Sequence, residues 1–521
     1  MHVRFLGAVI AVEIFGLGWL GSATAQITPP PEAFFERVAD RHREVARQFY
    51  QKYLDIDGLP VVAAAEVDDR ALIQTATIVR SMLAGRPDVQ KAMAGSGMYL
   101  IIIGRRQVYT DMPEYRDHPE PEFINERVRG TGGRPTSFGE ENLLSWPIDR
   151  YDDESIAVHE FAHTIDGTLR RLDPDWTERR NTVYRHAMQK GLWRGTYAAS
   201  NPGEYWAEIV QCYFDCNRVN NWNHGPIATR EQLQQYDPEG YELVRSTLRI
   251  PPDRDWRYQF LKQLPCVEAP PPELGLDPYF TKYTWAREFL VLGRTAGDES
   301  LLYANHTIRQ MFAYRHDMLK GLIALGVRLY ILGAGERVVD LPDYRHWQDI
   351  TGLDPALRRV DYSPATRLLV VDQEAIGKAR RRGSGEDDPV VRAMALAVWR
   401  ALATRPVDPA WEQRPRRLWQ QYELGLERVD ERFRQRSTEL FEQATQRGLW
   451  RGTAGGHSPE MYWTKGVLIY FGACGQDHPY FESGRPVDNQ AALKEYDPDL
   501  YEFIEKAFAR QGRPTWQAVR E

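Results

Sequence analysis

The chain contains the same sequence pattern twice, and this repeat limits the folds that it can adopt. The hexapeptide Gly-Leu-Trp-Arg-Gly-Thr occurs unchanged at residues 191–196 and 448–453. Three other segments recur in the same order: residues 111–116 return at 340–345, residues 172–176 at 407–411, and residues 236–242 at 496–502. Four matches in one order indicate an internal duplication, so we expect two related domains.

The length of the chain agrees with two domains. A single hydrophobic core stops growing at roughly 250 to 300 residues, and this chain has 521. A proline-rich stretch at residues 268–273 separates the two copies and suits a stiff linker. We therefore predict one domain over residues 26–266, a linker over 267–277 and a second domain over 278–521.

Each copy combines few strands with many helix-like segments. Helical periodicity comes first, a strand follows at residues 98–103 in the first copy and at 327–332 in the second, and a helix-rich half completes each copy. This order predicts an α+β fold with a small sheet in each domain. The repeated unit is too long, and its strands are too few, for a solenoid or a propeller.

Residues 1–25 have the pattern of a secretory signal. Arg4 supplies positive charge, residues 5–20 are mostly apolar, and Ala23-Thr24-Ala25 is a small-residue cleavage site. A membrane anchor is the alternative, but Glu13 interrupts the apolar run, which is shorter than the ~20 residues of a spanning helix. We therefore expect a secreted or periplasmic protein, with no integral membrane segment after cleavage.

The composition limits the class of partner. With 42% apolar and 12% aromatic residues, the chain should be globular, and its net charge of -7 provides no basic surface for a phosphate backbone. Nucleic acid is therefore not an expected partner. Disulfides are permitted in an exported chain, but the sequence does not select a pairing among Cys212, Cys216, Cys266 and Cys474.

The segment from His159 to His163 is an H-E-x-x-H motif within a predicted helix over residues 152–172. Residues four apart share a helix face, so both imidazoles can reach one ion while Glu160 points toward a water bound there. The acidic residues 152–154 favour the start of this helix. The alternative is an exposed helix that carries these residues by chance. Histidine is scarce, at 12 residues in the chain, so a chance H-E-x-x-H motif is improbable.

A catalytic zinc site needs a third protein ligand and an open fourth position. The best source is the segment Asn-Pro-Gly-Glu-Tyr-Trp-Ala-Glu at residues 201–208. Asn201 is a good N-cap and Pro202 suits the first helical position, so Glu204 and Glu208 would share one helix face. Each glutamate also has a structural alternative, Glu204 in a capping box with Asn201 and Glu208 on a solvated face.

These two motifs resemble those of the gluzincin peptidases, and among them the catalytic domain of anthrax lethal factor. The resemblance lies in His-Glu-Phe-Ala-His-Thr-Ile-Asp at 159–166 and Glu-Tyr-Trp-Ala-Glu at 204–208, and it covers residues 152–215 well. It implies a zincin-like fold with a substrate strand near residues 136–146 and Glu204 as the zinc ligand. It also implies that Tyr197 assists the transition state, and that Asp166 and Glu208 support the site by orienting the imidazoles.

The second copy lacks the proposed site. The matched segments 172–176 and 407–411 share an Asp-Pro-x-Trp motif. When the alignment of these segments is extended backwards, Met394, Ala395 and Val398 lie opposite His159, Glu160 and His163. When the alignment of the two hexapeptides is extended forwards, Ala454, Met461 and Lys465 lie opposite Tyr197, Glu204 and Glu208. The aromatic pair at 205–206 returns at 462–463, so packing residues are kept where donors are lost. We therefore expect the second domain to be non-catalytic.

The sequence thus predicts a secreted zinc-dependent endopeptidase with one Zn²⁺ per chain. Zinc and Glu160 would activate a water, and Tyr197 would stabilise the oxyanion. One alternative is a secreted binding or scaffolding protein with a structural zinc, whose fourth ligand would be His186 or His224. An intact Glu160 has no role in such a closed site. The other alternative is a zinc hydrolase that cleaves a non-peptide amide bond.

Overall fold

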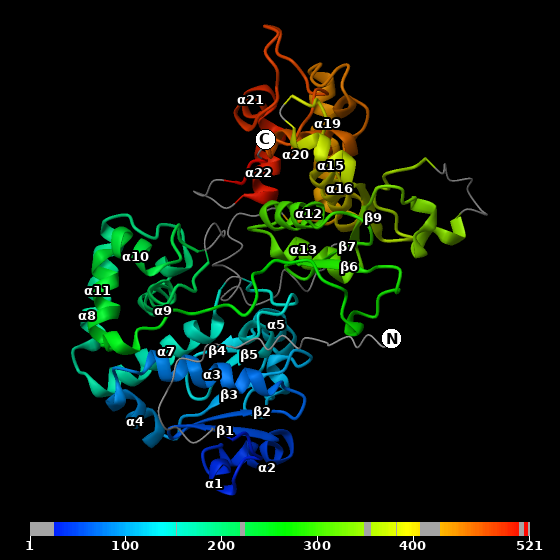
Figure 1. Cartoon of the computed structure of the whole chain (residues 1–521). Helices are drawn as coiled ribbons and strands as arrows, with labels where there is room; N and C mark the ends of the chain where they lie inside the picture. Colours follow the sequence, from blue (N-terminus) through cyan, green and yellow to red (C-terminus); the bar gives the residue numbers. More distant parts are fainter. Residues whose placement is uncertain are drawn as a thin grey trace, which may run out of the picture.

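The computed structural model describes residues 26–152, 154–218, 224–347, 356–381, 383–406, 428–509 and 515–518. The predicted secretory signal and the repeat segment at 407–411 lie outside the described residues. The fold is α+β, with two small mixed sheets on either side of the proline-rich stretch (Figure 1). We call the described residues up to 266 the first half and those from 278 onward the second half.

The first sheet has five strands in the order β1-β2-β3-β5-β4. Strands β1 (Lys52–Ile56) and β2 (Leu59–Ala63) form an antiparallel hairpin, and β3 (Leu100–Ile103) and β5 (Thr136–Gly139) continue in parallel. Strand β4 (Gly130–Thr131) pairs antiparallel with β5 and forms one edge. The strand expected at 98–103 is confirmed. The strand expected at 136–146 ends at Gly139, because α6 (Glu140–Leu143) follows, and β4 occupies the edge position.

Both faces of this sheet are covered, which explains why the strand Leu-Ile-Ile-Ile of β3 is apolar throughout. Ile101 and Ile103 pack with the aromatic residues of α1 (Glu32–Phe35) and with α2 (Asp40–Phe49). Leu100 and Ile102 face the opposite way, toward α3 (Asp69–Met82), α4 (Pro87–Gly95) and α7 (Ile156–Leu172). Successive side chains of a strand alternate between faces, so four apolar residues in a row need two packed layers.

The helix-rich part of the first half follows the sheet. Helix α7 lies along α9 (Pro202–Tyr213), with α8 (Trp176–Gln189), α10 (Arg230–Tyr236) and α11 (Pro238–Leu248) beside them (Figure 1). The buried Trp193 donates a hydrogen bond from Nε1 to Asp237 (2.8 Å), and the Tyr205 hydroxyl donates to the same carboxylate (2.6 Å). The remaining elements of the half are η1 (Tyr109–Asp111), α5 (Pro121–Arg127), η2 (Tyr197–Ala199) and η3 (Pro252–Arg254).

The second sheet repeats the strand directions of the first. Strands β6 (Lys282–Ala286) and β7 (Phe289–Gly293) are antiparallel, and β8 (Arg328–Leu332) and β9 (Leu368–Asp372) continue in parallel, so the strand expected at 327–332 is confirmed. The other elements are η4 (Pro272–Leu274), α12 (Asp298–Met311), α13 (His316–Ala324), η5 (Val338–Asp340), η6 (Pro342–Trp347), α15 (Gln373–Arg380), α16 (Pro389–Ala397), the π-helical η7 (Val398–Leu402), α19 (Glu431–Gln446), η8 (Ala454–Gly456), α20 (Pro459–Tyr470), α21 (Gln490–Tyr496) and α22 (Pro498–Phe508).

Matching hydrogen bonds relate α7 to α16. The Trp206 indole donates to the carbonyl oxygen of Ala162 (2.9 Å), and the Trp463 indole donates to that of Ala395 (3.0 Å). The backbone N–H just before each helix donates to the chain that follows α9 or α20, from Ser155 in the first half and from Asp388 in the second. These contacts define which residues of α16 and α7 correspond.

The correspondence corrects the sequence register. Arg392, Ala393 and Leu396 lie opposite the three residues of the H-E-x-x-H motif, instead of Met394, Ala395 and Val398. The two registers differ by two residues. The Asp-Pro-x-Trp motif begins directly after α7 ends at Leu172, but in the second half several residues separate the end of η7 at Leu402 from the motif. A register extended backwards from the motif across this longer connection is therefore displaced.

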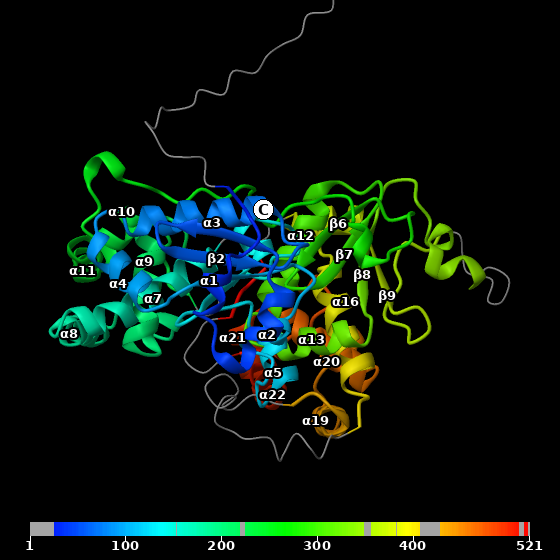
Figure 2. The same ribbon diagram turned by 90° about the horizontal axis from the view of Figure 1, so that it is seen from below.

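The two halves lie side by side (Figure 2) and are joined by ion pairs. Arg309 on α12 pairs with Asp152 (2.6 Å), and Arg150 pairs with Glu288 (3.0 Å). None of the four cysteines forms a disulfide. Within the described part of the chain, no helix has the length and hydrophobicity needed to cross a membrane.

Candidate metal centre

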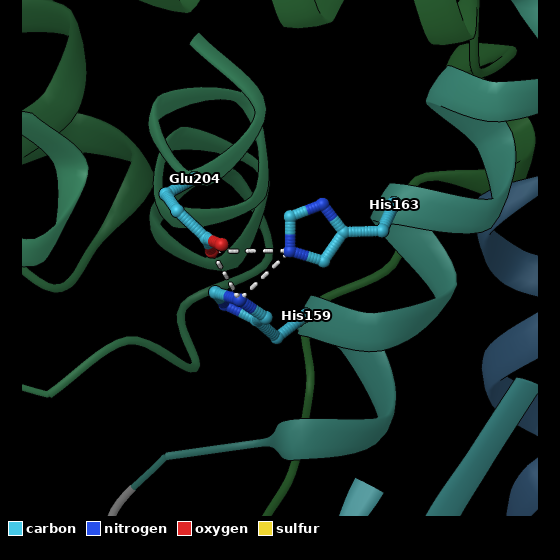
Figure 3. Close-up of side chains that lie close together, drawn as sticks. All are labelled: His159, His163 and Glu204. Atoms are coloured by element: carbon cyan, nitrogen blue, oxygen red, sulfur yellow. Dashed lines mark hydrogen bonds and ion pairs between the residues drawn. The ribbon is translucent and has the colours of Figure 1, made fainter. Parts of the chain in front are cut away.

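Three side chains from two helices meet at one point. His159 and His163 lie one turn apart on α7, and Glu204 points toward them from α9 (Figure 3). The Glu204 Oε2 atom lies 3.2 Å from His159 Nε2 and 3.1 Å from His163 Nε2, and the two Nε2 atoms are 3.1 Å apart. These residues form a group that could hold a metal ion.

The spacing of the three atoms fits a tetrahedral zinc ion. Zinc binds imidazole nitrogen and carboxylate oxygen at about 2.0–2.1 Å, so two ligand atoms in a tetrahedral site lie ~3.3 Å apart. The three observed distances, 3.1 to 3.2 Å, are close to that edge length. Three protein donors occupy three corners of a tetrahedron, which leaves the fourth for water or substrate.

The local sequence explains the position of Glu204. The Asn201 side chain accepts hydrogen bonds from the backbone N–H groups of Gly203 (2.8 Å) and Glu204 (3.0 Å), and Pro202 takes the first helical position. Helix α9 therefore begins where the sequence predicts. The Glu204 carboxylate contacts the two imidazoles, while the backbone, rather than the side chain, of Glu204 interacts with Asn201.

Helix α7 begins later than the sequence predicts. Its first residue is Ile156, and its N-cap is Ser155, whose side chain accepts from the N–H of Val158. The acidic residues Asp152 and Glu154 precede the helix because both are buried in ion pairs, Asp152 with Arg309 and Glu154 with Arg218 and His224. No acidic residue lies in the first turn, so the proposed dipole interaction was wrong.

The charges of the triad stabilise one another. Burial opposes ionisation of Glu204, but hydrogen bonds with His159 and His163 hold the pKa of Glu204 well below its ordinary value. Burial also opposes protonation of His159, yet the hydrogen bond with Glu204 and the charges of Glu160, Glu204 and Glu208 raise the pKa of His159 to about 10. The triad therefore attracts a cation, which can be a proton or a metal ion.

Glu160 lies between the two histidines in the sequence, and its carboxyl is shielded from solvent. Burial raises the pKa of Glu160 above its ordinary value, against the opposing charges of His159 and His163 and a hydrogen bond from the Gly132 backbone. A raised pKa brings a carboxylate closer to the operating pH of a general base. The fold thus gives Glu160, beside the two histidines, a carboxylate with raised proton affinity.

Because residue 132 is a glycine, the chain after β4 can pass close to α7. A Cβ at residue 132 would lie 2.4 Å from the Cβ of His163 and 2.8 Å from the carbonyl oxygen of Glu160. Real Cβ atoms do not come so close, so only glycine fits. Sequence reasoning missed this residue, although the pair Gly132-Gly133 before a strand is a signal of close backbone approach.

Tyr197 lies beside the triad, on η2. Its half-buried ring is 6.1 Å from the His159 ring, centroid to centroid, and 6.5 Å from the His224 ring. The short helix η2 packs against α9, which carries Glu204. The fold therefore brings the predicted oxyanion-stabilising residue next to the triad.

The contacts of Asp166 do not fit its predicted role. Its carboxylate accepts from the Trp176 indole (2.7 Å) and pairs with Arg170 and Arg180. Arg170 lies on α7, one or more turns beyond His163, and Trp176 and Arg180 lie on α8. Asp166 therefore joins two helices and orients no imidazole.

Gln211, rather than Glu208, forms a hydrogen bond with the His159 ring. Its Oε1 atom lies 2.8 Å from His159 Nδ1, and its Nε2 donates to the Ser155 carbonyl oxygen (3.1 Å). Glu208 Oε1 is 3.9 Å from the same Nδ1, beyond hydrogen-bonding distance. An amide oxygen that accepts from Nδ1–H leaves Nε2 as the free lone pair, which is the metal-binding tautomer. Sequence reasoning missed Gln211 because it considered carboxylates only.

Glu208 belongs to a second buried cluster, with Glu154 and His224, that could also hold a metal ion. The Oε2 atom of Glu208 accepts from His224 Nδ1 and from the Asn217 amide, both at 3.0 Å. Burial opposes protonation of His224, but the charges of Glu154 and Glu208 raise its pKa. Arg218 lies 3.4 Å from Glu154, so cationic side chains balance the carboxylates.

The two histidines proposed as a fourth ligand are both engaged elsewhere. His224 contacts Glu208 and Glu154, and His186 is exposed on α8, where it pairs with Glu239 (2.8 Å). In the second half, Arg392 and Met461 stand where His159 and Glu204 stand in the first. Comparison with protein-family models and with curated proteins found no match. The geometry of the triad is therefore the main guide to function.

Proposed function

We propose that this protein is a zinc-dependent endopeptidase that is exported from the cytoplasm and uses one Zn²⁺ per chain. The spacing of His159, His163 and Glu204 carries the proposal, because three converging donors near tetrahedral distances leave one open position. The H-E-x-x-H helix and the Glu-Tyr-Trp-Ala-Glu helix resemble the gluzincin peptidases, and the peptide substrate is inferred from that resemblance.

In the proposed peptide hydrolysis, each residue of the candidate site would have a separate role. Zinc, when bound, would polarise the scissile carbonyl and lower the pKa of water. Glu160 would take a proton from the attacking water and deliver it to the leaving amine. Tyr197 would donate a hydrogen bond to the oxyanion. Gln211 would hold the His159 ring so that Nε2 faces the metal.

We further propose that the chain consists of two tandem zincin-like domains, over residues 26–266 and 278–521, of which only the first is catalytic. The shared strand directions and the matching indole hydrogen bonds of Trp206 and Trp463 support common ancestry of the halves. Protein zinc sites are built from cysteine, histidine and carboxylate ligands, so Arg392 and Met461 support the loss of the site in the second half.

The test uses the mature full-length chain and three substitutions. Glu160→Gln should retain one zinc per chain and lose turnover, because the amide fills the same space but cannot accept a proton. His163→Ala should lose both. Glu178→Gln, on the exposed surface of α8, is the matched control and should change neither.

Zinc is measured by elemental analysis, and activity by proteomic mapping of cleavage sites. Full peptidase activity of the Glu160→Gln protein would contradict the proposed mechanism. Stoichiometric zinc without cleavage of any peptide would favour the binding protein with a structural zinc. Cleavage of non-peptide amides alone would favour the other hydrolase.

A further inference from the structure

The second half contains a pocket of about 540 Å³ at the position that the metal centre occupies in the first half. Helix α16 contributes Arg392, which corresponds to His159, and α20 contributes Met461 and Lys465. Side chains of a disused site are expected to repack, because interiors are close-packed and voids are costly. An open pocket within the usual 300–1,000 Å³ range of ligand sites therefore requires an explanation.

Charged side chains of both signs make up most of the pocket lining. Five cationic side chains and four carboxylates line it: Arg358, Arg359, Lys378, Arg392 and Lys465, with Asp372, Glu386, Asp387 and Asp477. Three of the carboxylates are paired. Arg358 forms an ion pair with Asp372 (2.9 Å). Lys465 forms ion pairs with Asp387 (2.8 Å) and Asp477 (2.9 Å).

Arg392 forms no close ion pair with any carboxylate that the structure describes. Its nearest carboxylate is Asp361, at 3.7 Å, and Asp361 is not part of the pocket lining. The Nε atom of Arg392 is buried and has no hydrogen-bond partner among the described residues. Arg359, which is exposed, lies 3.8 Å from the same Asp361. A buried guanidinium N–H without an acceptor is costly, and an anion that entered the pocket would supply one.

We propose that this pocket binds a small anionic molecule through a carboxylate or phosphate group held by Arg392. The planar guanidinium can grip either group with two parallel hydrogen bonds. Arg359 and Lys378 would add charge at the exposed side, and Met461 and Ala454 would contact the apolar part of the ligand. The loss of the metal donors thus changed the chemistry of the site from cation binding to anion binding.

The test is calorimetric titration of the mature full-length protein with inorganic phosphate and with citrate, at constant ionic strength. One equivalent of at least one probe should bind saturably. Arg392→Gln should weaken that binding about tenfold or more, since a charge-assisted hydrogen bond is lost. Arg359→Gln should weaken it severalfold. Arg436→Gln, on the exposed side of α19 and away from the pocket, is the matched control.

The two probes separate the sources of the anion. Saturable binding of phosphate alone identifies a phosphate ligand, and binding of citrate alone identifies a carboxylate. If Arg392→Gln does not fold, the exposed Arg359→Gln still tests the site. The absence of saturable binding of both probes to the wild type would overturn the proposal. So would equal affinities for the wild type, Arg359→Gln and any folded Arg392→Gln protein. Zinc content is measured in parallel and should be unchanged in every variant.

Discussion

Replacement of Gly132 by alanine should damage the metal centre, although residue 132 is neither a ligand nor the base. The new Cβ would lie 2.4 Å from the Cβ of His163 and 2.8 Å from the carbonyl oxygen of Glu160. Carbon atoms in contact lie about 3.5–4.0 Å apart, so the loop or α7 must move by ~1 Å or more. Both neighbouring atoms are fixed by the helix backbone, so no change of rotamer relieves the overlap.

The magnitude follows from this displacement. Overpacking costs about 1–3 kcal/mol of stability, and a misplacement of ~1 Å can lower turnover ~100-fold. We therefore expect the Gly132→Ala protein to unfold at lower urea concentration, to bind zinc more weakly and to lose most peptidase activity. The assays are urea denaturation, zinc titration against a competing chelator and cleavage of a peptide substrate.

Gly167→Ala is the matched control. Residue 167 lies in α7, the helix that Gly132 approaches, but a Cβ at residue 167 would meet nothing within 4 Å. Alanine is favoured over glycine within a helix by about 0.5–1 kcal/mol, so this variant should be slightly more stable and equally active. A Gly132→Ala protein that matches the wild type in all three assays would refute the steric argument.

Three further predictions concern other residues. Gln211→Ala should weaken zinc binding ~10 to 100-fold, because the His159 ring loses the acceptor that orients it; unchanged affinity in a chelator competition would exclude that role. Asp166→Asn should lower the urea midpoint but leave the zinc content intact, because Asp166 pairs with arginines and not with a ligand; loss of zinc from folded protein would contradict this. N-terminal sequencing of exported protein should begin at Gln26, and an intact Met1 in a membrane fraction would count against a cleaved signal.

The sequence predicted those parts of the site that depend on local geometry. Two histidines four apart on a helix must share a face, and Asn201-Pro202 specifies where α9 begins. Spacing put both Glu204 and Glu208 on one face of α9, and the resemblance to the gluzincin peptidases favoured Glu204. The strands at 98–103 and 327–332 were equally clear, because short apolar runs between turn signals are typical of buried strands.

The parts that depend on tertiary contacts could not be predicted. Gln211 orients His159 across 52 residues of sequence, and no local pattern distinguishes it from other polar helix residues. Asp166 was misjudged because its partner Arg180 lies on the next helix. The register between the halves failed because the second copy has more residues between its helix and the Asp-Pro-x-Trp motif, a difference that the amino-acid pattern does not reveal.

The ion pair between Asp152 and Arg309 has an evolutionary consequence. The Asp152 side chain is 3% exposed and the Arg309 side chain is 15% exposed, so the two charges are largely shielded from water and stabilise each other. Removal of one member of a buried pair typically costs about 3–5 kcal/mol. Asp152 lies three residues before Ser155, the N-cap of α7, so a substitution of Arg309 in the second half would affect the start of the helix that carries His159 and His163. If only the first half is catalytic, as proposed, the second half would still be retained by selection for the counter-charge that it supplies.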